Sequence, residues 1–366
     1  MFQIKETKEI LSTKIWCVHP AFVESVKPLI LSYLNSGSAS KPFAGKDDDE
    51  EETLAEKCTK LLQGVNSEAR QILFLENPEG FFANKENKAS EDVEFINVID
   101  LRSSVTRYGG WCSIGSVEHR DHMIFASTCP NCIGHLMVID TPGGSAYAMN
   151  DYQVGISAAR AAGQPVISFV DGMCLSAGVA AACQTDETYA LHPNCEIGCI
   201  GVMGSFVTIA DGTERDGYVY HELYDPESFE KNRSYRDIAN DNDTKLFLKE
   251  LASTGVDFRN LVKQNRPSIK DEALHGKIYR AEEMLGVLVD GIMSLEDVVA
   301  RIIAIHDGAP LIERKNLSES DNDNPKDGDD NNNDDEDETP PPTIVPKGTA
   351  PLDYTPKPTI ITNNHE

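Results

Sequence analysis

The stretch DGMCLSAGVAAA, residues 171–182, decides how the rest of this chain is interpreted. It follows PVISFV, a short apolar run typical of a buried strand, and it continues into small residues typical of a helix. The pattern predicts a turn from strand to helix, with Ser176 at the turn. Serine is also common at helix starts, so by itself it assigns no function here. The question is which other residues converge on the Ser176 hydroxyl.

The segments on either side of this turn predict an α/β fold. VEFINVIDL (residues 93–101) and HLMVIDT (135–141) are short apolar runs that predict strands, and YQVGISAARAAG (152–163) predicts a helix. A strand, a turn, a helix and a second strand form a crossover unit. A long amphipathic helix is expected after residue 231 and should end near Pro267. Its apolar face is formed by Phe247, Leu251, Phe258, Leu261 and Val262.

Composition divides the chain into three parts. Residues 1–90 predict a mainly helical extension, with apolar residues at helical spacing from Phe22 to Leu34 and again from Leu54 to Ile72. An acidic loop, with six consecutive carboxylates at 47–52, lies between them. Residues 91–312 form the predicted α/β domain. Residues 313–366 are rich in Asp, Asn and Pro and cannot bury enough apolar surface to fold, so we expect a disordered tail.

The charge of the chain excludes several classes of partner. A formal net charge of −27 is unfavourable for binding nucleic acid phosphates or anionic lipid. No apolar run reaches the roughly 20 residues that cross a bilayer, and the N-terminus lacks the apolar core of a secretory signal. We therefore expect a cytoplasmic protein without nucleic acid or membrane partners.

The cysteines do not form the pattern of a disulfide-stabilised protein. There are nine, an odd number spread along the chain, and we expect reduced thiols. Cys129 and Cys132 have CxxC spacing, and Cys195 with Cys199 could complete a zinc site. Ordinary packed or surface thiols are the favoured alternative, so we predict no metal and no cofactor.

A glycine pair provides a candidate site for a developing negative charge. Asp140-Thr-Pro-Gly-Gly144 follows directly after the predicted strand HLMVIDT. Two glycines let the backbone turn sharply and expose its N–H groups to a ligand, which is the outline of an oxyanion hole. A turn that only connects strand to helix has the same composition, and this alternative stays open.

Three motifs in order resemble the signal peptide peptidase A family of Ser/Lys peptidases. They are DTPGGSA (140–146), DGMCLSAGVAAA (171–182) and DETYALHPNCEIGCIGV (186–202), and the resemblance spans about residues 93–305. It implies a Clp protease/crotonase-like fold, a spiral of strand-helix units. It also implies that Ser176 is the nucleophile and that the amides of Gly144 and Ala177 form the oxyanion hole. Leu175 and Cys199 depart from the family pattern, which puts substrate preference in doubt.

The family's base is a lysine located after the serine. In YHELYDPESFEKNRSYRDI (220–238), Lys231 is the one lysine, and Ser228 could form a hydrogen bond near it. A lysine can accept a proton only when burial lowers its pKa. The alternatives are that Lys231 is a solvated surface residue, or that His192 or His221 is the base in a Ser/His/Asp arrangement.

The resemblance implies a serine endopeptidase without metal or nucleotide. Because no membrane span is expected, the chain looks closer to the soluble branch in phage genomes, which matures proheads by cutting scaffold and capsid proteins, than to the membrane-bound members. Family members assemble as homo-oligomeric rings in which a neighbouring subunit can supply the lysine. Two rival functions stay open: a crotonase-type acyl-CoA hydratase or hydrolase, which also uses paired amides, and a non-catalytic capsid scaffold component.

Overall fold

The computed structural model describes residues 16–18, 53–61, 71–84, 92–109, 114–204 and 223–314, with residues 16–18 and 61 described by their backbone alone. The chain divides into two units, Met1–Ser320 and Asp321–Glu366, and all described residues belong to the first. The helix expected around Phe22 to Leu34, the acidic loop, His221 and residues 315–366 of the expected tail lie outside the described residues.

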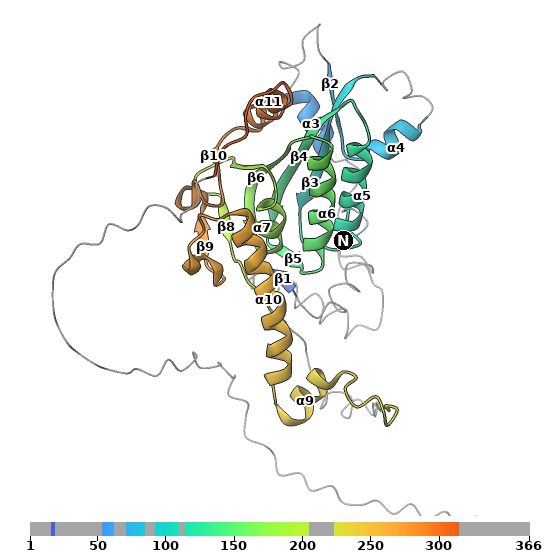
Figure 1. Cartoon of the computed structure of the whole chain (residues 1–366), viewed down its shortest axis with the longest axis vertical. Helices are drawn as coiled ribbons and strands as arrows, with labels where there is room; N and C mark the ends of the chain where they lie inside the picture. The colour runs from blue at the N-terminus through green and yellow to red at the C-terminus, as the bar shows by residue number, and fades with distance from the viewer. Residues whose placement is uncertain are drawn as a thin grey trace, which may run out of the picture. The chain divides into compact units, whose positions relative to one another are not determined.

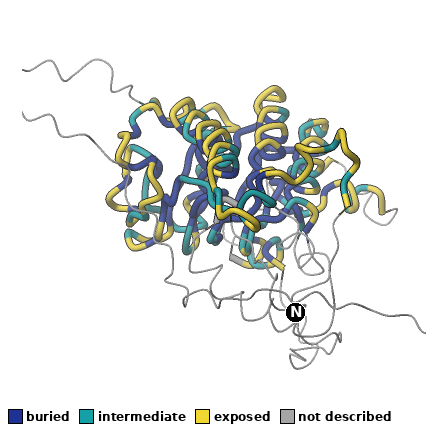
Figure 2. Tube along the Cα trace, turned by 90° about the horizontal axis from the view of Figure 1, so that it is seen from below, coloured by how far each residue is buried: buried dark blue, intermediate teal, exposed yellow. Residues whose placement is uncertain are grey.

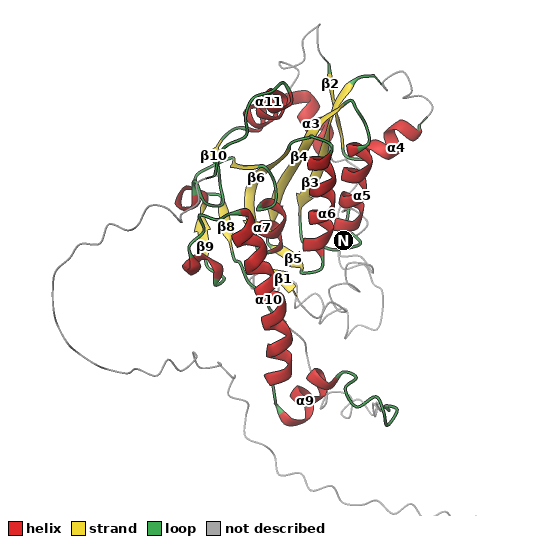
Figure 3. Ribbon diagram, viewed as in Figure 1, coloured by secondary structure: helices red, strands yellow, loops and turns green. Residues whose placement is uncertain are grey.

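The centre of the fold is an eight-stranded sheet (Figures 1 and 3). Its main path has the order β10-β7-β6-β4-β3-β2, and all neighbours on that path are parallel. The strands are β2 (Ile72–Leu75), β3 (Glu94–Arg102), β4 (Cys132–Thr141), β6 (Val166–Leu175), β7 (Glu187–Ala190) and β10 (Gly291–Ile292). β8 (Glu196–Gly198) pairs with the end of β6 and with the antiparallel strand β9 (Ile278–Arg280).

Helices cover both faces of this sheet because the central strands are apolar on both sides. Successive residues of a strand point to opposite faces, so Leu136 and Val138 of β4 enter one hydrophobic cluster, and Met137 and Ile139 enter another. The first pair packs with α3 (Leu54–Leu61) and α11 (Leu295–His306). The other face carries α5 (Ser116–Ser127), α6 (Ala148–Ala161), α7 (Ala177–Ala182) and part of α10 (Lys245–Asn265). Figure 2 shows the buried strands inside a shell of half-exposed helices.

The remaining elements lie around this body. They are β1 (Trp16–Val18), β5 (Gly143–Ser145), α4 (Pro78–Ala83), α9 (Arg233–Asp241) and two short 3-10 helices, η3 (Asp271–Leu274) and η4 (Ala281–Met284). Figure 1 shows α9 at the N-terminal end of α10, while the C-terminal part of α10 lies against α7. Among the described residues, no helix is sufficiently long and apolar to cross a membrane.

The α/β class predicted from the sequence is confirmed, and so are its main strands. The amphipathic helix before Pro267 is α10, which buries Phe247, Phe258 and Val262. The expectation that Ile72 lies on a helix is wrong. The run ILFL forms strand β2, which pairs with β3, so the sheet takes in residues on both sides of the expected domain boundary at residue 91. β2 is the last strand on the main path, and the burial of its apolar side chains through pairing with β3 outweighs the helical spacing.

Candidate functional site

Ser176 lies at a strained turn between β6 and α7. Its backbone has φ +54° and ψ −110°, which is unfavourable for any residue with a Cβ and costs about 1–3 kcal/mol. The Ser176 N–H donates to the Gly198 carbonyl at 2.8 Å, and its carbonyl accepts from the Ala180 N–H at 3.0 Å. The hydroxyl donates to the Gly201 carbonyl at 3.4 Å. A strained turn of this kind, from strand to helix, presents the serine nucleophile in one large class of hydrolases.

Small residues let α7 pack closely against the end of β4. A Cβ on Gly178 would lie 2.5 Å from the Thr141 Cγ2, so glycine lets α7 approach β4 without displacing the Thr141 side chain. All six residues of α7 are buried. The Ala177 N–H is among the first of the helix, which have no acceptor within the helix. The AGVAAA composition therefore fixes the distance between the Ser176 turn and the strand that leads to the glycine pair.

The glycine pair forms strand β5, directly after β4 and in contact with α7. The Val105 N–H donates to the Gly143 carbonyl at 2.9 Å, and the Ser145 N–H donates to the Val105 carbonyl at 2.8 Å. A Cβ on Gly144 would lie 1.9 Å from the Val105 oxygen, so the close approach of the two chains requires glycine here. The structure thus brings Gly144, Ala177 and Ser176 to the same end of the sheet.

Two residues that hold this end of the sheet were missed in the sequence. The Thr141 hydroxyl accepts from the Gly143 N–H at 3.2 Å and donates to the Ser103 carbonyl. The Asp140 carboxylate accepts from the Met173 N–H at 2.9 Å, which ties β4 to β6. The signal was a carboxylate and a hydroxyl immediately before Pro-Gly-Gly, but their partners Met173 and Ser103 are far along the chain and cannot be inferred from spacing.

The IGCIGV segment provides the acceptor for the Ser176 amide. Gly198 and Cys199 both have positive φ, +124° and +55°, and the Cys199 N–H donates to the Lys277 carbonyl at 2.8 Å. Cys199 is buried, and burial raises the pKa of its thiol. A thiol with a raised pKa is a poor nucleophile at neutral pH, which leaves Ser176 as the better candidate.

Lys231 and His192, the two candidate bases that the structure describes, form no hydrogen bond with Ser176 in this single chain. Lys231 is exposed in the turn before α9, and the Ser228 hydroxyl bonds to the Asp225 carboxylate at 3.3 Å. His192 is also exposed, and its Nδ1 accepts from the Asn194 N–H at 3.1 Å. Within the described ranges, no lysine or histidine side chain forms a hydrogen bond with the Ser176 hydroxyl.

The cysteines of the zinc alternative are free thiols. Cys129, Cys132, Cys195 and Cys199 form no disulfide, and burial raises the pKa of Cys132 to about 12. In the part of the chain that the structure describes, no group of three or more His, Cys, Asp and Glu side chains is arranged to hold a metal ion.

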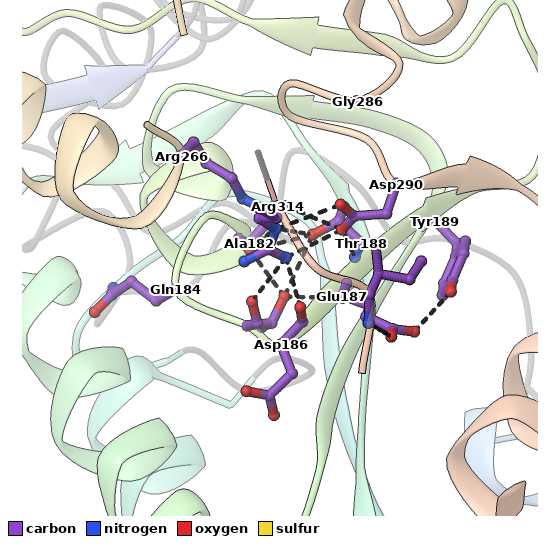
Figure 4. A network of polar contacts seen from close by, with 12 residues as sticks. Ala182, Gln184, Asp186, Glu187, Thr188, Tyr189, Arg266, Gly286, Asp290 and Arg314 are labelled. Atoms are coloured by element: carbon purple, nitrogen blue, oxygen red, sulfur yellow. Dashed lines mark hydrogen bonds and ion pairs between the residues drawn. The ribbon is translucent and has the colours of Figure 1, made fainter. Parts of the chain in front are cut away.

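A buried ionic network holds the other end of α7 (Figure 4). The Arg266 guanidinium is fully buried, donates to the Ala182 carbonyl at 3.1 Å, and pairs with Asp290 at 3.0 Å. Arg314 reaches the same carboxylate at 3.1 Å. Burial raises the pKa of Asp290, but the charges and hydrogen bonds of the two arginines outweigh it and lower that pKa overall. Because Ala182 ends α7, this network fixes the helix that begins after Ser176.

No protein-family model matches this chain, and no curated protein does. Among solved structures, a ClpP1 mutant from Listeria monocytogenes is similar with a TM-score of 0.35 and 12% identity, covering 55% of this chain and 92% of that chain. A peptidase from Plasmodium falciparum is similar with a TM-score of 0.34 and 11% identity, covering 54% and 95% respectively. Both TM-scores are below 0.5, so any function must be argued from the residues of this chain.

Proposed function

We propose that the protein is a serine endopeptidase of the signal peptide peptidase A type, with Ser176 as its nucleophile. The observation that carries the proposal is the backbone of Ser176, which is held at φ +54° between β6 and α7. Strain of this kind persists only where the surrounding structure enforces it, and it gathers at functional sites. A connecting turn or a scaffold role would not require a serine in this conformation.

The proposed reaction uses three groups of the chain. A neutral amine accepts the proton of the Ser176 hydroxyl, and the oxygen attacks the carbonyl carbon of a peptide bond. The amides of Gly144 and Ala177 donate to the oxyanion that forms. The amine returns its proton to the leaving nitrogen, and the C–N bond breaks. Water then attacks the acyl-enzyme, the amine again takes and returns the proton, and Ser176 is released.

Lys231 is the proposed amine, supplied by a neighbouring subunit. A lysine accepts a proton only in its neutral form, which requires removal from water. Lys231 is exposed in the single chain, so a second chain is needed to cover it. Large apolar side chains before and after it in the sequence are exposed too: Leu223 (93%), Phe229 (64%) and Leu248 (55%). Exposed apolar side chains of this kind support assembly through this part of the chain.

The proposed substrates are proteins, and the motif resemblance extends the proposal to scaffold and capsid proteins of a phage prohead. The two glycines of β5 offer backbone groups to an extended chain, and pairing of this kind is tolerant of sequence. A hydratase acting on acyl-CoA would also use paired amides, but it has no need of a serine nucleophile.

Mixing two inactive variants tests both the base and its origin. Ser176→Ala and Lys231→Ala should each abolish cleavage of an unfolded protein, and a mixture of the two, allowed to exchange subunits, should regain activity. Lys245→Ala is the matched control, because its side chain is 91% exposed and close in sequence. Full activity of Lys231→Ala would exclude Lys231 as the base. If both variants are inactive and their mixture stays inactive, a neighbouring subunit does not supply the lysine.

A further inference from the structure

Strand β1 pairs with the glycine strand that is proposed to bind the oxyanion. Trp16–Val18 runs antiparallel to Gly143–Ser145, with Trp16 opposite Ser145, Cys17 opposite Gly144, and Val18 opposite Gly143. Figure 1 shows β1 beside β5 at the end of the sheet. More than 120 residues separate the two strands in the sequence, so this pairing is a tertiary contact and not a hairpin.

The backbone directions of β5 show which of its groups face β1. The Gly143 carbonyl and the Ser145 N–H both bond to Val105, so they point to that side of the strand. Backbone groups of successive residues in a strand point to alternate edges. The N–H and carbonyl of Gly144 therefore point to the other edge, where Cys17 is its partner. The amide that would hold the oxyanion is thus the one that faces β1.

An incoming peptide has one edge of β5 available to it. Val105 takes one edge, and a Cβ on Gly144 would meet its oxygen, so no further strand fits between them. The other edge is the one that β1 occupies.

We infer that Trp16–Val18 occupies the backbone edge on which an extended substrate pairs, so that the chain's own N-terminal segment competes with its substrate. This inference rests on the proposed peptidase function and adds the binding mode: the substrate is an extended segment, antiparallel to Gly143–Ser145. β1 must leave this edge before the Gly144 amide can hold a substrate carbonyl. The segment acts as a built-in competitor.

A proline at position 17 tests the competition in the full-length protein. Proline has no N–H and cannot pair inside a strand, so Cys17→Pro should release β1, while Cys17→Ser keeps the backbone and is the matched control. Covalent labelling of Ser176 by a fluorophosphonate should be about tenfold faster in Cys17→Pro than in the other two, as expected for the loss of two backbone hydrogen bonds. Hydrogen exchange of the Gly144 amide, which needs no catalysis, should become faster by a similar factor.

The two readings of this experiment separate the inference from the proposed function. If wild type, Cys17→Ser and Cys17→Pro are labelled at equal rates and their Gly144 amides exchange at equal rates, the inference about β1 is overturned. The proposed peptidase function is then unaffected. The opposite result is that the Gly144 amide is protected in wild type and Cys17→Ser but not in Cys17→Pro, while no folded variant is labelled at Ser176. This result would reject the proposed peptidase function, and with it the competition between β1 and a substrate.

A free peptide provides a second test on the same site. A synthetic peptide of residues 12–22 should inhibit labelling of Cys17→Pro competitively, and the same peptide with proline at position 17 should not. Inhibition by neither peptide, or by both equally, would contradict pairing through the backbone of Cys17.

Discussion

At the scale of single residues, the site depends on backbone geometry more than on side-chain chemistry. Ser176 has a positive φ without being glycine, and Gly144 is placed where a Cβ would collide with the Val105 oxygen. Both turns are held by backbone hydrogen bonds: the Ser176 N–H donates to the Gly198 carbonyl, and Val105 bonds to Gly143 and Ser145, the neighbours of Gly144. The surrounding strands therefore determine where the hydroxyl and the amides lie.

The strain at Ser176 can be measured with two substitutions that both remove the hydroxyl. Ser176→Gly should be more stable to unfolding than Ser176→Ala by about 1 kcal/mol, because glycine adopts φ +54° without the Cβ penalty. Urea unfolding of the two variants gives the difference. At an unstrained position the order is reversed, so a less stable glycine variant would contradict strain at this turn.

At the scale of elements, α7 is held at both ends. At its beginning, the Ser176 N–H donates to the carbonyl of Gly198, the last residue of β8; at its end, Arg266 of the turn after α10 donates to the last carbonyl. Helix C-termini favour a cation, and a buried guanidinium there needs its carboxylate partner. Thus α10, β10 and the segment around Arg314 all contribute to the position of the short helix.

Removing Arg266 should therefore destabilise the fold strongly. Arg266→Met removes one of the two arginine partners of the buried Asp290 carboxylate and one hydrogen bond each from the Ala182 carbonyl and the Thr188 hydroxyl, which should cost about 3 kcal/mol. Arg314→Met is the matched control and should cost less, because the Arg314 side chain is 20% exposed and water can replace it. Denaturant unfolding compares the two; equal losses would contradict the role assigned to Arg266.

The buried His135 side chain on β4 makes the stability of the fold sensitive to pH. His135 is buried, accepts from Asn97 at Nδ1 and donates to Gln164 from Nε2, and burial lowers its pKa from 6.5 to about 4. Between these two values the unfolded chain binds the proton more tightly than the folded chain. Stability is therefore complete above pH 6.5 and is lost as the pH falls toward 4, by about 2 kcal/mol at pH 5 for this residue.

The measurement is unfolding in urea at pH 7 and pH 5. His135→Gln should show a smaller loss of stability between the two pH values than wild type. Part of the loss should persist, because burial also lowers the pKa of His119 to about 4. An unchanged loss in His135→Gln would show that this ring does not titrate as described.

At the scale of the whole molecule, the sequence predicts the layers of the fold. It predicts few of the contacts between segments that are distant in the sequence. Apolar runs such as residues 135–141 and the small residues after Ser176 are local patterns, so β4, β6 and α7 could be predicted. The pairing of β2 with β3, and of β1 with β5, depends on segments that meet only in the folded chain. Helical spacing around Ile72 was misleading because strand pairing outweighs it.

The candidate site also has a part that the sequence predicts and a part that only the structure shows. The motif resemblance implies Ser176, Ala177 and Gly144 as site residues, and the structure puts the elements β5 and α7 in contact. The contributions of Thr141, Val105 and Arg266 could not be predicted, because each bonds to a backbone group far away in the sequence, at Ser103, Gly143 and Ala182 respectively. The base stays a prediction, because a residue supplied by a second chain leaves no trace in the contacts of one.

The central claim is that Ser176 is a nucleophile, and covalent labelling of the full-length protein tests it most directly. The folded wild type is treated with a fluorophosphonate and digested, and the modified peptide is identified by mass. We expect one adduct, on the peptide that contains Ser176, and none in Ser176→Ala or in the urea-unfolded chain. An adduct that persists in Ser176→Ala, or cleavage of an unfolded protein by that variant at the wild-type rate, would contradict the account.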